Sequence, residues 1–193
     1  HCTLDTFELW NPKDGTLKKA KRKVEEFVDV FPKDDKGLLL MGPVGTGKTH
    51  LAVAALQQIM RDKRPPVHGR FADFTSLVLE IQMTFGGSGS SREILEPLVD
   101  ADVLVLDELG AGKTTPWVMD LLYYLVNTRY LEGRLTLFTT NFSDHPKNHE
   151  DSLSDRVSKR IRSRLHEMCR PVTLLGGDYR EEHLATREGG LRL

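Results

Sequence analysis

The sequence predicts an α/β domain in which helices cover both faces of a five-stranded parallel sheet. Two patterns point to this class: apolar strand-like stretches alternate with stretches of helical spacing, and a glycine-rich phosphate-binding motif joins one strand to a helix. The chain has 193 residues, 39% of them hydrophobic and 28% charged, which suits one compact domain and excludes wholesale disorder.

Charge, apolar runs and cysteines narrow the possible environments and partners. The formal net charge is −1, so a site for a polyanion has to be a local patch. No apolar run approaches the ~20 residues that cross a bilayer, so we expect no membrane partner. Cys2 and Cys169 are too few for a disulfide framework, which favours a reducing compartment, the cytoplasm. The chain opens with His1, and we expect a longer protein whose N-terminal region is missing here.

The elements of the N-terminal half follow from local patterns. Residues 16–31 place apolar side chains at helical spacing between charges, which predicts an amphipathic helix. Residues 37–41 are apolar on both faces, as in a buried parallel strand. Next we expect a helix over 48–61, a strand over 67–73, a helix over 74–85 and a Gly/Ser turn over 86–91.

The C-terminal half continues the alternation. A helix over 92–99 precedes an apolar strand over 102–107 that ends in an acid. We then expect a helix over 116–131, a strand over 135–140, a loop over 142–151, a basic helix over 153–168 and a strand over 172–175. No repeat or domain-scale linker interrupts this order. The expected organisation is an N-terminal segment with its helix (1–36), a nucleotide-binding core (37–180) and a tail (181–193).

The strongest motif is G-x-x-x-x-G-K-T, placed between a strand and a helix as nucleotide binding requires. It consists of Gly42, Pro43, Val44, Gly45, Thr46, Gly47, Lys48 and Thr49, and His50 follows it. Glycines let backbone amides surround phosphate oxygens, Lys48 is expected to contact the β- and γ-phosphates, and the Thr49 hydroxyl to bind Mg²⁺. The alternative is a glycine-rich turn with a chance Lys-Thr pair.

Polar residues at two further strand ends complete a hydrolytic site. Asp107 is expected to hold Mg²⁺ and Glu108 to act as general base, although paired acids at a strand end are often only a solvated loop. Asn141 has an amide that can orient the attacking water, or it is simply a turn residue. Arg160 and Arg164 lie four residues apart on one side of the basic helix, where either can reach a neighbour's nucleotide or belong to a solvated face.

These motifs, with RIRSRLHEMC and GDYR near the C-terminus, resemble the AAA+ ATPase domain of the DnaC/DnaI bacterial helicase loaders and, slightly less closely, the IstB transposition helpers. The resemblance runs from about Leu4 to Arg180. It implies an AAA+ P-loop NTPase with strand order 5-1-4-3-2 and a reduced or absent lid domain. It also implies that the domain binds ATP and ADP with Mg²⁺ and assembles with further copies of itself. The implied partners are single-stranded DNA and, through the missing N-terminal region, a replicative helicase.

The resemblance assigns further roles. Asn141 is similar to sensor 1, Arg164 to the arginine finger with Arg160 as alternative or helper, and Arg180 matches a recurrent position without a fixed role. Phe85, Thr115 and Trp117 resemble positions that contact single-stranded DNA, where bases stack on aromatic rings. The alternative is that both rings belong to the core. We expect the adenine to bind near residues 7–12.

Two other functions remain open from the sequence. The first is a transposition helper of the IstB kind that organises duplex target DNA with the same fold. The second is a nucleotide-sensing module with negligible turnover, against which Glu108 and Asn141 argue. A preference for single-stranded or for duplex DNA distinguishes a helicase loader from the transposition helper. A single-turnover hydrolysis assay distinguishes an ATPase from the sensing module.

Overall fold

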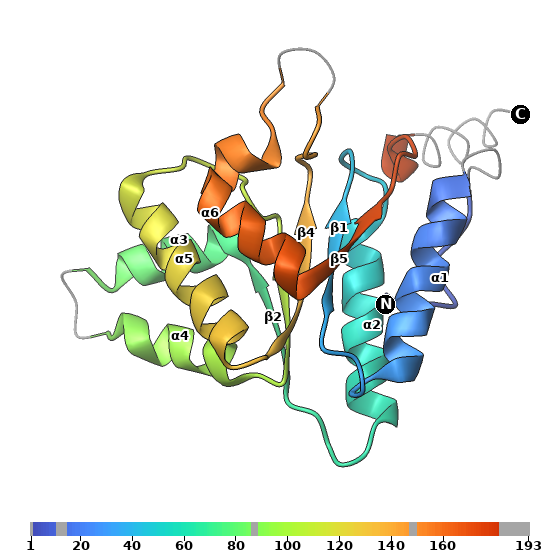
Figure 1. Cartoon of the computed structure of the whole chain (residues 1–193), viewed down its shortest axis with the longest axis horizontal. Helices are drawn as coiled ribbons and strands as arrows, with labels where there is room; N and C mark the ends of the chain where they lie inside the picture. The colour runs from blue at the N-terminus through green and yellow to red at the C-terminus, as the bar shows by residue number, and fades with distance from the viewer. Residues whose placement is uncertain (1, 11–14, 86–88, 147–149, 182–193) are drawn as a thin grey trace, which may run out of the picture.

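The computed structural model describes residues 2–10, 15–85, 89–146 and 150–181, which form a three-layer α/β unit (Figure 1). The sheet contains β1 (Gly37–Met41), β2 (Gly69–Asp73), β3 (Val103–Asp107), β4 (Leu135–Thr140) and β5 (Cys169–Thr173). All pairings are parallel and the order is β2-β3-β4-β1-β5, which confirms the expected topology.

Helices cover the two faces of the sheet unequally (Figure 1). One face carries α1 (Gly15–Val30) and α2 (Lys48–Asp62), and the other carries α3 (Phe74–Met83), α4 (Ser91–Asp100), α5 (Pro116–Leu131) and α6 (Leu153–Met168). Because side chains alternate along a strand, Leu38 and Leu40 belong to the first core, whereas Leu39 and Met41 belong to the second. The strands of the sheet centre are therefore buried on both sides.

Each predicted helix and strand is present in the structure, and a few of them begin or end at other residues than predicted. Strand β5 begins at Cys169 and not at Val172, because α6 runs directly into it and Cys169 pairs with Gly37 of β1. Pro171 is tolerated because β5 is an edge strand. Helix α3 ends at Met83, two residues early, and part of the predicted Gly/Ser turn (86–88) lies outside the described residues.

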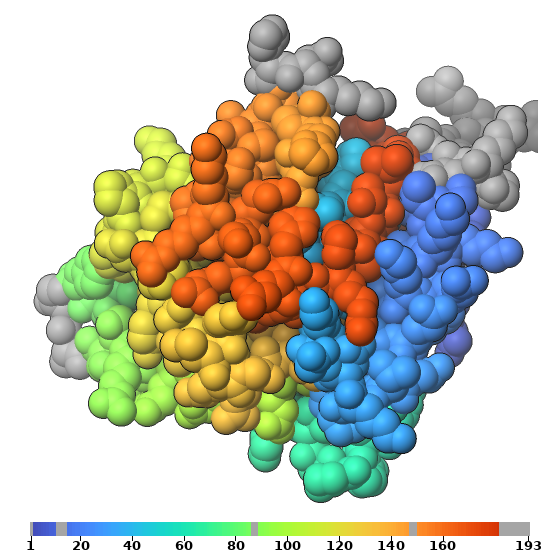
Figure 2. All heavy atoms as spheres, viewed as in Figure 1, coloured from blue at the N-terminus to red at the C-terminus, as the bar shows by residue number. Residues whose placement is uncertain are grey.

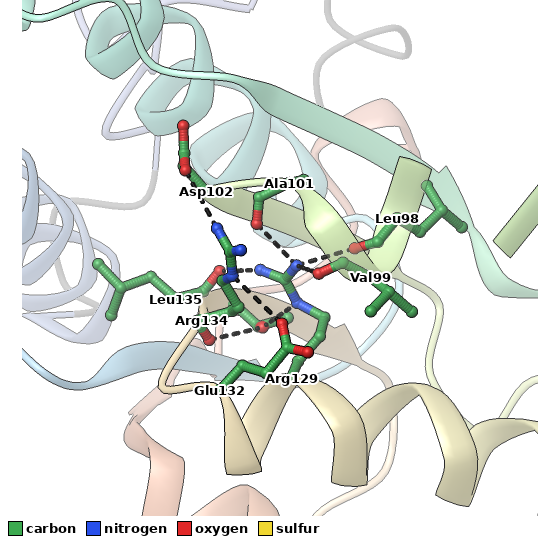
Figure 3. A network of polar contacts seen from close by, with 9 residues as sticks. Leu98, Val99, Ala101, Asp102, Arg129, Glu132, Arg134 and Leu135 are labelled. Carbon is green, nitrogen blue, oxygen red and sulfur yellow. Dashed lines mark hydrogen bonds and ion pairs between the residues drawn. The ribbon is translucent and has the colours of Figure 1, made fainter. Parts of the chain in front are cut away.

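One buried cation on α5 joins the end of α4 to the start of β4 (Figure 3). Arg129 of α5 is 1% exposed and has no carboxylate as hydrogen-bond partner among the described residues. At the end of α4, its guanidinium donates to the carbonyls of Leu98 (2.8 Å), Val99 (2.9 Å) and Ala101 (2.8 Å). At the start of β4, it donates to the carbonyl of Leu135 (2.6 Å) and the hydroxyl of Thr136 (2.9 Å). Arg129 thus fixes α4 and α5 to the sheet.

The two ends of the described chain concern the segment before the P-loop and the expected lid. Residues 2–10 and α1 pack into the first core through Leu4, Phe7 and Leu17, so the segment before the P-loop is part of the folded unit. The tail beyond Glu181, and with it the expectation of a reduced or absent lid, lies outside the described residues. Within the part that is described, no helix is long and apolar enough to traverse a bilayer.

Candidate active site

A cavity of about 510 Å³ lies at the carboxyl ends of β1, β3 and β4. This is where a parallel sheet with reversing strand order forms a ligand crevice. Its walls come from the N-terminal segment, the P-loop, the ends of two strands and the last described residues. They are lined by Thr6, Phe7, Glu8, Trp10, the run Val44–His50, Asp107, Glu108, Thr139, Asn141, Tyr179 and Arg180.

The P-loop has the backbone that a phosphate cradle needs. Gly45 and Gly47 have φ values of 75° and 91°, a region that side chains rarely adopt. A Cβ would lie 2.0 Å from the carboxylate of Asp178 at Gly45 and 2.6 Å from the ring of Phe7 at Gly47. Both glycines are therefore favoured by their backbone conformation, and Gly47 also by the close approach of the buried Phe7 ring. The loop leads into α2, whose N-terminal amides and dipole favour an anion.

Lys48, the first residue of α2, is 6% exposed and donates from Nζ to the carbonyl of Pro43 at 2.6 Å. Burial lowers its pKa from 10.5 to about 8, because desolvation penalises the charged form more than Asp107 and Glu108 stabilise it. Arg180 contributes in the same direction as burial, since it places a second cation near the ammonium. A bound polyphosphate would add negative charge beside both cations and favour the charged form of Lys48.

The expected Mg²⁺ ligands lie together at the end of β3. The Thr49 hydroxyl donates to Oδ1 and Oδ2 of Asp107 at 2.9 and 3.1 Å, and Thr139 donates to Oδ1 at 2.5 Å. Asp107 is 6% exposed, so its carboxylate is held in one orientation between two hydroxyls. A carboxylate and a hydroxyl beside a phosphate cradle are hard oxygen donors of the kind that Mg²⁺ takes together with nucleotide phosphates.

The two residues expected to handle water line the same cavity. Glu108 is exposed, and its backbone has φ 56°, held by a hydrogen bond from its N–H to the Thr139 hydroxyl at 3.0 Å. Asn141 follows β4 and is also exposed. Both side chains therefore have access to solvent beside the P-loop lysine.

Aromatic residues form part of the cavity wall and are called the aromatic wall here: Phe7, Trp10 and Tyr179. The rings of Trp10 and Tyr179 lie 6.2 Å apart, and the Tyr179 hydroxyl donates to Glu8 at 3.1 Å. The N–H of Tyr179 donates to the carbonyl of Gly45 at 3.1 Å, which ties the GDYR segment to the P-loop. The expected base-binding segment thus lines the cavity through Phe7, Glu8 and Trp10, while Pro12 lies outside the described residues.

The two arginines expected to act in trans lie on α6, outside the lining of this chain's own cavity. Arg160 stacks 4.0 Å from the centroid of the Tyr123 ring and donates to its hydroxyl, and Arg164 lies 4.8 Å from the centroid of the Tyr130 ring. Figure 2 shows α6 in orange at the molecular surface. The helix is interrupted at Ser158, where φ is 71°, so these arginines follow a kink.

The three residues expected to contact DNA are also absent from the lining of the cavity. The rings of Phe85 and Trp117 meet edge to face, with centroids 5.2 Å apart. Phe85 is 60% exposed, which contradicts a core position for that ring, whereas Trp117 is partly buried against the second core. The Thr115 hydroxyl accepts the N–H of Val118 and caps α5, a structural role the sequence reasoning missed.

The fold and the cavity define a P-loop NTPase of the AAA+ class. The chain belongs to the family of IstB-like ATP-binding proteins, whose model matches residues 13–186. The replicative helicase loader DnaC of Escherichia coli K12 is 28% identical over 163 residues, 84% of this chain and 63% of that protein. This chain thus spans less than two thirds of that relative.

Two solved structures are similar to this chain over at least nine tenths of their length. A crystal structure of the DnaC helicase loader has a TM-score of 0.77 and 30% identity, over 90% of this chain and 96% of that one. A crystal structure of DnaI has a TM-score of 0.68 and 26% identity, over 92% and 90%. These likenesses confirm the family resemblance that the motifs indicate.

Proposed function

We propose that this chain is the ATP-hydrolysing AAA+ domain of a DNA-replication helicase loader, and that its ATP state controls self-assembly, single-stranded DNA binding and helicase loading. The observation that carries the proposal is the convergence of Lys48, Thr49, Asp107, Glu108 and Asn141 on one cavity. Family membership and the likeness to helicase loaders support it. The replicative helicase would dock on a region that precedes this chain.

The proposed hydrolysis uses the P-loop backbone and five side chains of the cavity. Backbone amides of the P-loop and the ammonium of Lys48 hold the phosphates, and Thr49 and Asp107 would hold Mg²⁺, which neutralises phosphate charge when bound. Glu108 accepts a proton from the attacking water, whose oxygen bonds to the γ-phosphorus while the bond to the bridging β–γ oxygen breaks. Asn141 orients that water.

The base is proposed to bind between the aromatic wall and the P-loop. Phe7, Trp10 and Tyr179 offer apolar surface there, and Glu8 offers an acceptor whose position the Tyr179 hydroxyl fixes. Arg180 reaches the phosphate side of the same cavity and would add a second cation there. The nucleotide would thereby join three segments that are far apart in sequence.

Completion of the site is proposed to need a second copy of the chain. Arg164, with Arg160 as alternative or helper, lies on α6 away from its own cavity, so it would stabilise transition-state charge on a neighbour's nucleotide. The proposed DNA contact is the ring pair of exposed Phe85 and partly buried Trp117, next to Thr115. Assembly would then present several such contacts along one strand.

A transposition helper that organises duplex target DNA is the second candidate, because the matching family model is described as IstB-like. The discriminating experiment measures ATP-dependent binding of the chain to an oligo-dT strand and to a duplex of equal length, with Lys48→Ala as the matched variant. We expect ATP-dependent preference for the single strand, lost in Lys48→Ala. A preference for the duplex would favour the second candidate and overturn the first.

A further inference from the structure

One buried hydroxyl in β4 contacts both acids at the end of β3. Thr139 is 1% exposed and lies two residues before Asn141. Its Oγ1 donates to Oδ1 of Asp107 at 2.5 Å and accepts the backbone N–H of Glu108 at 3.0 Å. Sequence alone does not distinguish it from an ordinary strand threonine.

Chemistry fixes the direction of these hydrogen bonds. A hydroxyl has one proton and two lone pairs, and a backbone N–H can only donate, so Glu108 N–H takes a lone pair of Thr139 Oγ1. The proton of the hydroxyl therefore points to the Asp107 carboxylate, which accepts when ionised. Because Thr49 donates to the same oxygen at 2.9 Å, the carboxylate is held by one hydroxyl from α2 and one from β4.

The same strand end holds the backbone around Glu108. With φ 56° this residue has a left-handed conformation that non-glycine residues rarely adopt, so other contacts must hold it there. The N–H of Leu109 donates to the carbonyl of Thr139 at 2.8 Å, and the Thr140 hydroxyl donates to the carbonyl of Leu109 at 2.8 Å. Together with the bond to Glu108 N–H, three hydrogen bonds from two threonines fix this turn.

We propose that Thr139 is a positioning residue for nucleotide hydrolysis, whose hydroxyl keeps the metal-binding carboxylate of Asp107 and the backbone of Glu108 in a fixed relation. The inference rests on the proposed function, since it assumes that these two acids serve Mg²⁺ and the attacking water. It adds a residue of the cavity wall whose hydroxyl acts through the two acids that it holds in place.

The test compares Thr139→Val, which removes the hydroxyl at nearly constant volume, with Thr139→Ser, which keeps it. Thr136→Val is the matched control, because Thr136 is equally buried in β4 and its hydroxyl serves Arg129 at 2.9 Å, far from the cavity lining. For each variant we would measure kcat, KM, melting temperature, and ADP affinity in EDTA and in Mg²⁺.

Thr139→Val should lower kcat about tenfold or more and reduce the gain in ADP affinity that Mg²⁺ brings, because one hydrogen bond to a charged group is lost. Its ADP affinity in EDTA should stay within about twofold of wild type, since the P-loop is untouched. Thr139→Ser should recover most of kcat. Thr136→Val should lower the melting temperature and leave kcat and the Mg²⁺ effect unchanged.

Three results would overturn the proposal: wild-type kcat and Mg²⁺ effect in Thr139→Val, equal loss in Thr139→Ser and Thr139→Val, or the same loss of kcat in Thr136→Val. If Thr139→Val does not fold, Thr139→Cys replaces it, because a thiol is a weak donor and should show the kcat loss that Thr139→Ser lacks. If the wild type binds nucleotide without turnover, the Mg²⁺ effect on ADP affinity decides.

A Lys48→Ala variant separates this test from failure of the proposed function. Unchanged nucleotide affinity in Lys48→Ala would end the assigned nucleotide site, whatever the Thr139 variants do. Lost affinity in Lys48→Ala together with a normal kcat and Mg²⁺ effect in Thr139→Val would overturn only the role of Thr139.

Discussion

Replacing Arg129 with methionine should strongly destabilise the domain, because this cation of α5 is the common partner of groups at the end of α4 and at the start of β4 (Figure 3). Methionine fills much of the space of the aliphatic stem but donates no hydrogen bond. Four backbone carbonyls and one hydroxyl would lose their shared donor: Leu98, Val99, Ala101, Leu135 and Thr136. The first three lie at or next to the end of α4, where carbonyls lack helical partners.

The size of the effect follows from two opposing contributions. Leaving a buried carbonyl unpaired costs about 1–3 kcal/mol, so four would cost roughly 4–12 kcal/mol before relaxation and water entry reduce it. Burial lowers the pKa of Arg129 to about 10, and removing the charge regains about 3 kcal/mol of desolvation. The two contributions differ by roughly 1–9 kcal/mol, and this range includes the loss of about 3–5 kcal/mol that is usual when a buried charged network is broken. A loss of about 3–5 kcal/mol corresponds to about 6–20 °C in melting temperature for a domain of this size.

Thermal unfolding followed by circular dichroism measures this effect, with Arg134→Met as control. Arg134 neighbours Arg129, but its side chain is 35% exposed and pairs with Asp102 and Glu132 at 3.3 and 3.4 Å. Because exposed ion pairs contribute about 0–1 kcal/mol, the control should lose only a few degrees. If Arg129→Met melts within about 2 °C of Arg134→Met, the hydrogen bonds of Arg129 do not hold α4 and α5 to the sheet as we reason.

Three further predictions concern the nucleotide, the assembly and DNA. Burial holds the pKa of Lys48 near 8, and a bound phosphate should raise this pKa. Nucleotide binding should therefore take up a proton at about pH 9 but not at about pH 7, and nucleotide affinity should fall as the pH rises above about 8. Calorimetry in buffers of different ionisation enthalpy measures the proton uptake, and equal uptake at both pH values would refute the reasoning. Arg164→Ala mixed with Glu108→Gln should regain activity that neither has alone, because one interface then holds both intact groups; no recovery, with full activity in dilute wild type, excludes action in trans. Phe85→Ala should lower the melting temperature by only a few degrees, because the ring is 60% exposed. Phe85→Ala and Trp117→Ala should each lose ATP-dependent binding to oligo-dT. Unchanged binding in both variants would contradict the stacking proposal.

Local patterns were sufficient for the elements and for the centre of the site. Apolar runs predict β1 and β3 because a strand buried on both faces needs apolar residues at every position. The P-loop and the placement of Asp107 and Glu108 at the end of β3 were predictable because each is a short pattern within one segment. Strand order came from the resemblance, since apolar patterns do not say which strands are neighbours.

Long-range contacts account for what local patterns left open. Tyr179 lines the cavity because its backbone pairs with Gly45, more than a hundred residues earlier, and no spacing rule connects the two. From the sequence, Arg129 is an ordinary basic residue in the last turn of a helix. In the structure it is buried and donates hydrogen bonds to carbonyls at the end of α4. The bond from Thr139 to Asp107 depends on the pairing of β3 with β4, so it is visible only once the sheet is assembled.

Nucleotide binding and turnover by Lys48→Ala and Glu108→Gln test the central claim most directly. Titration of each variant with a fluorescent ATP analogue in Mg²⁺, followed by a single-turnover assay, separates binding from chemistry. The account predicts that Lys48→Ala loses nucleotide affinity, whereas Glu108→Gln binds like wild type and does not hydrolyse ATP. Wild-type affinity in Lys48→Ala, or wild-type turnover in Glu108→Gln, would contradict it.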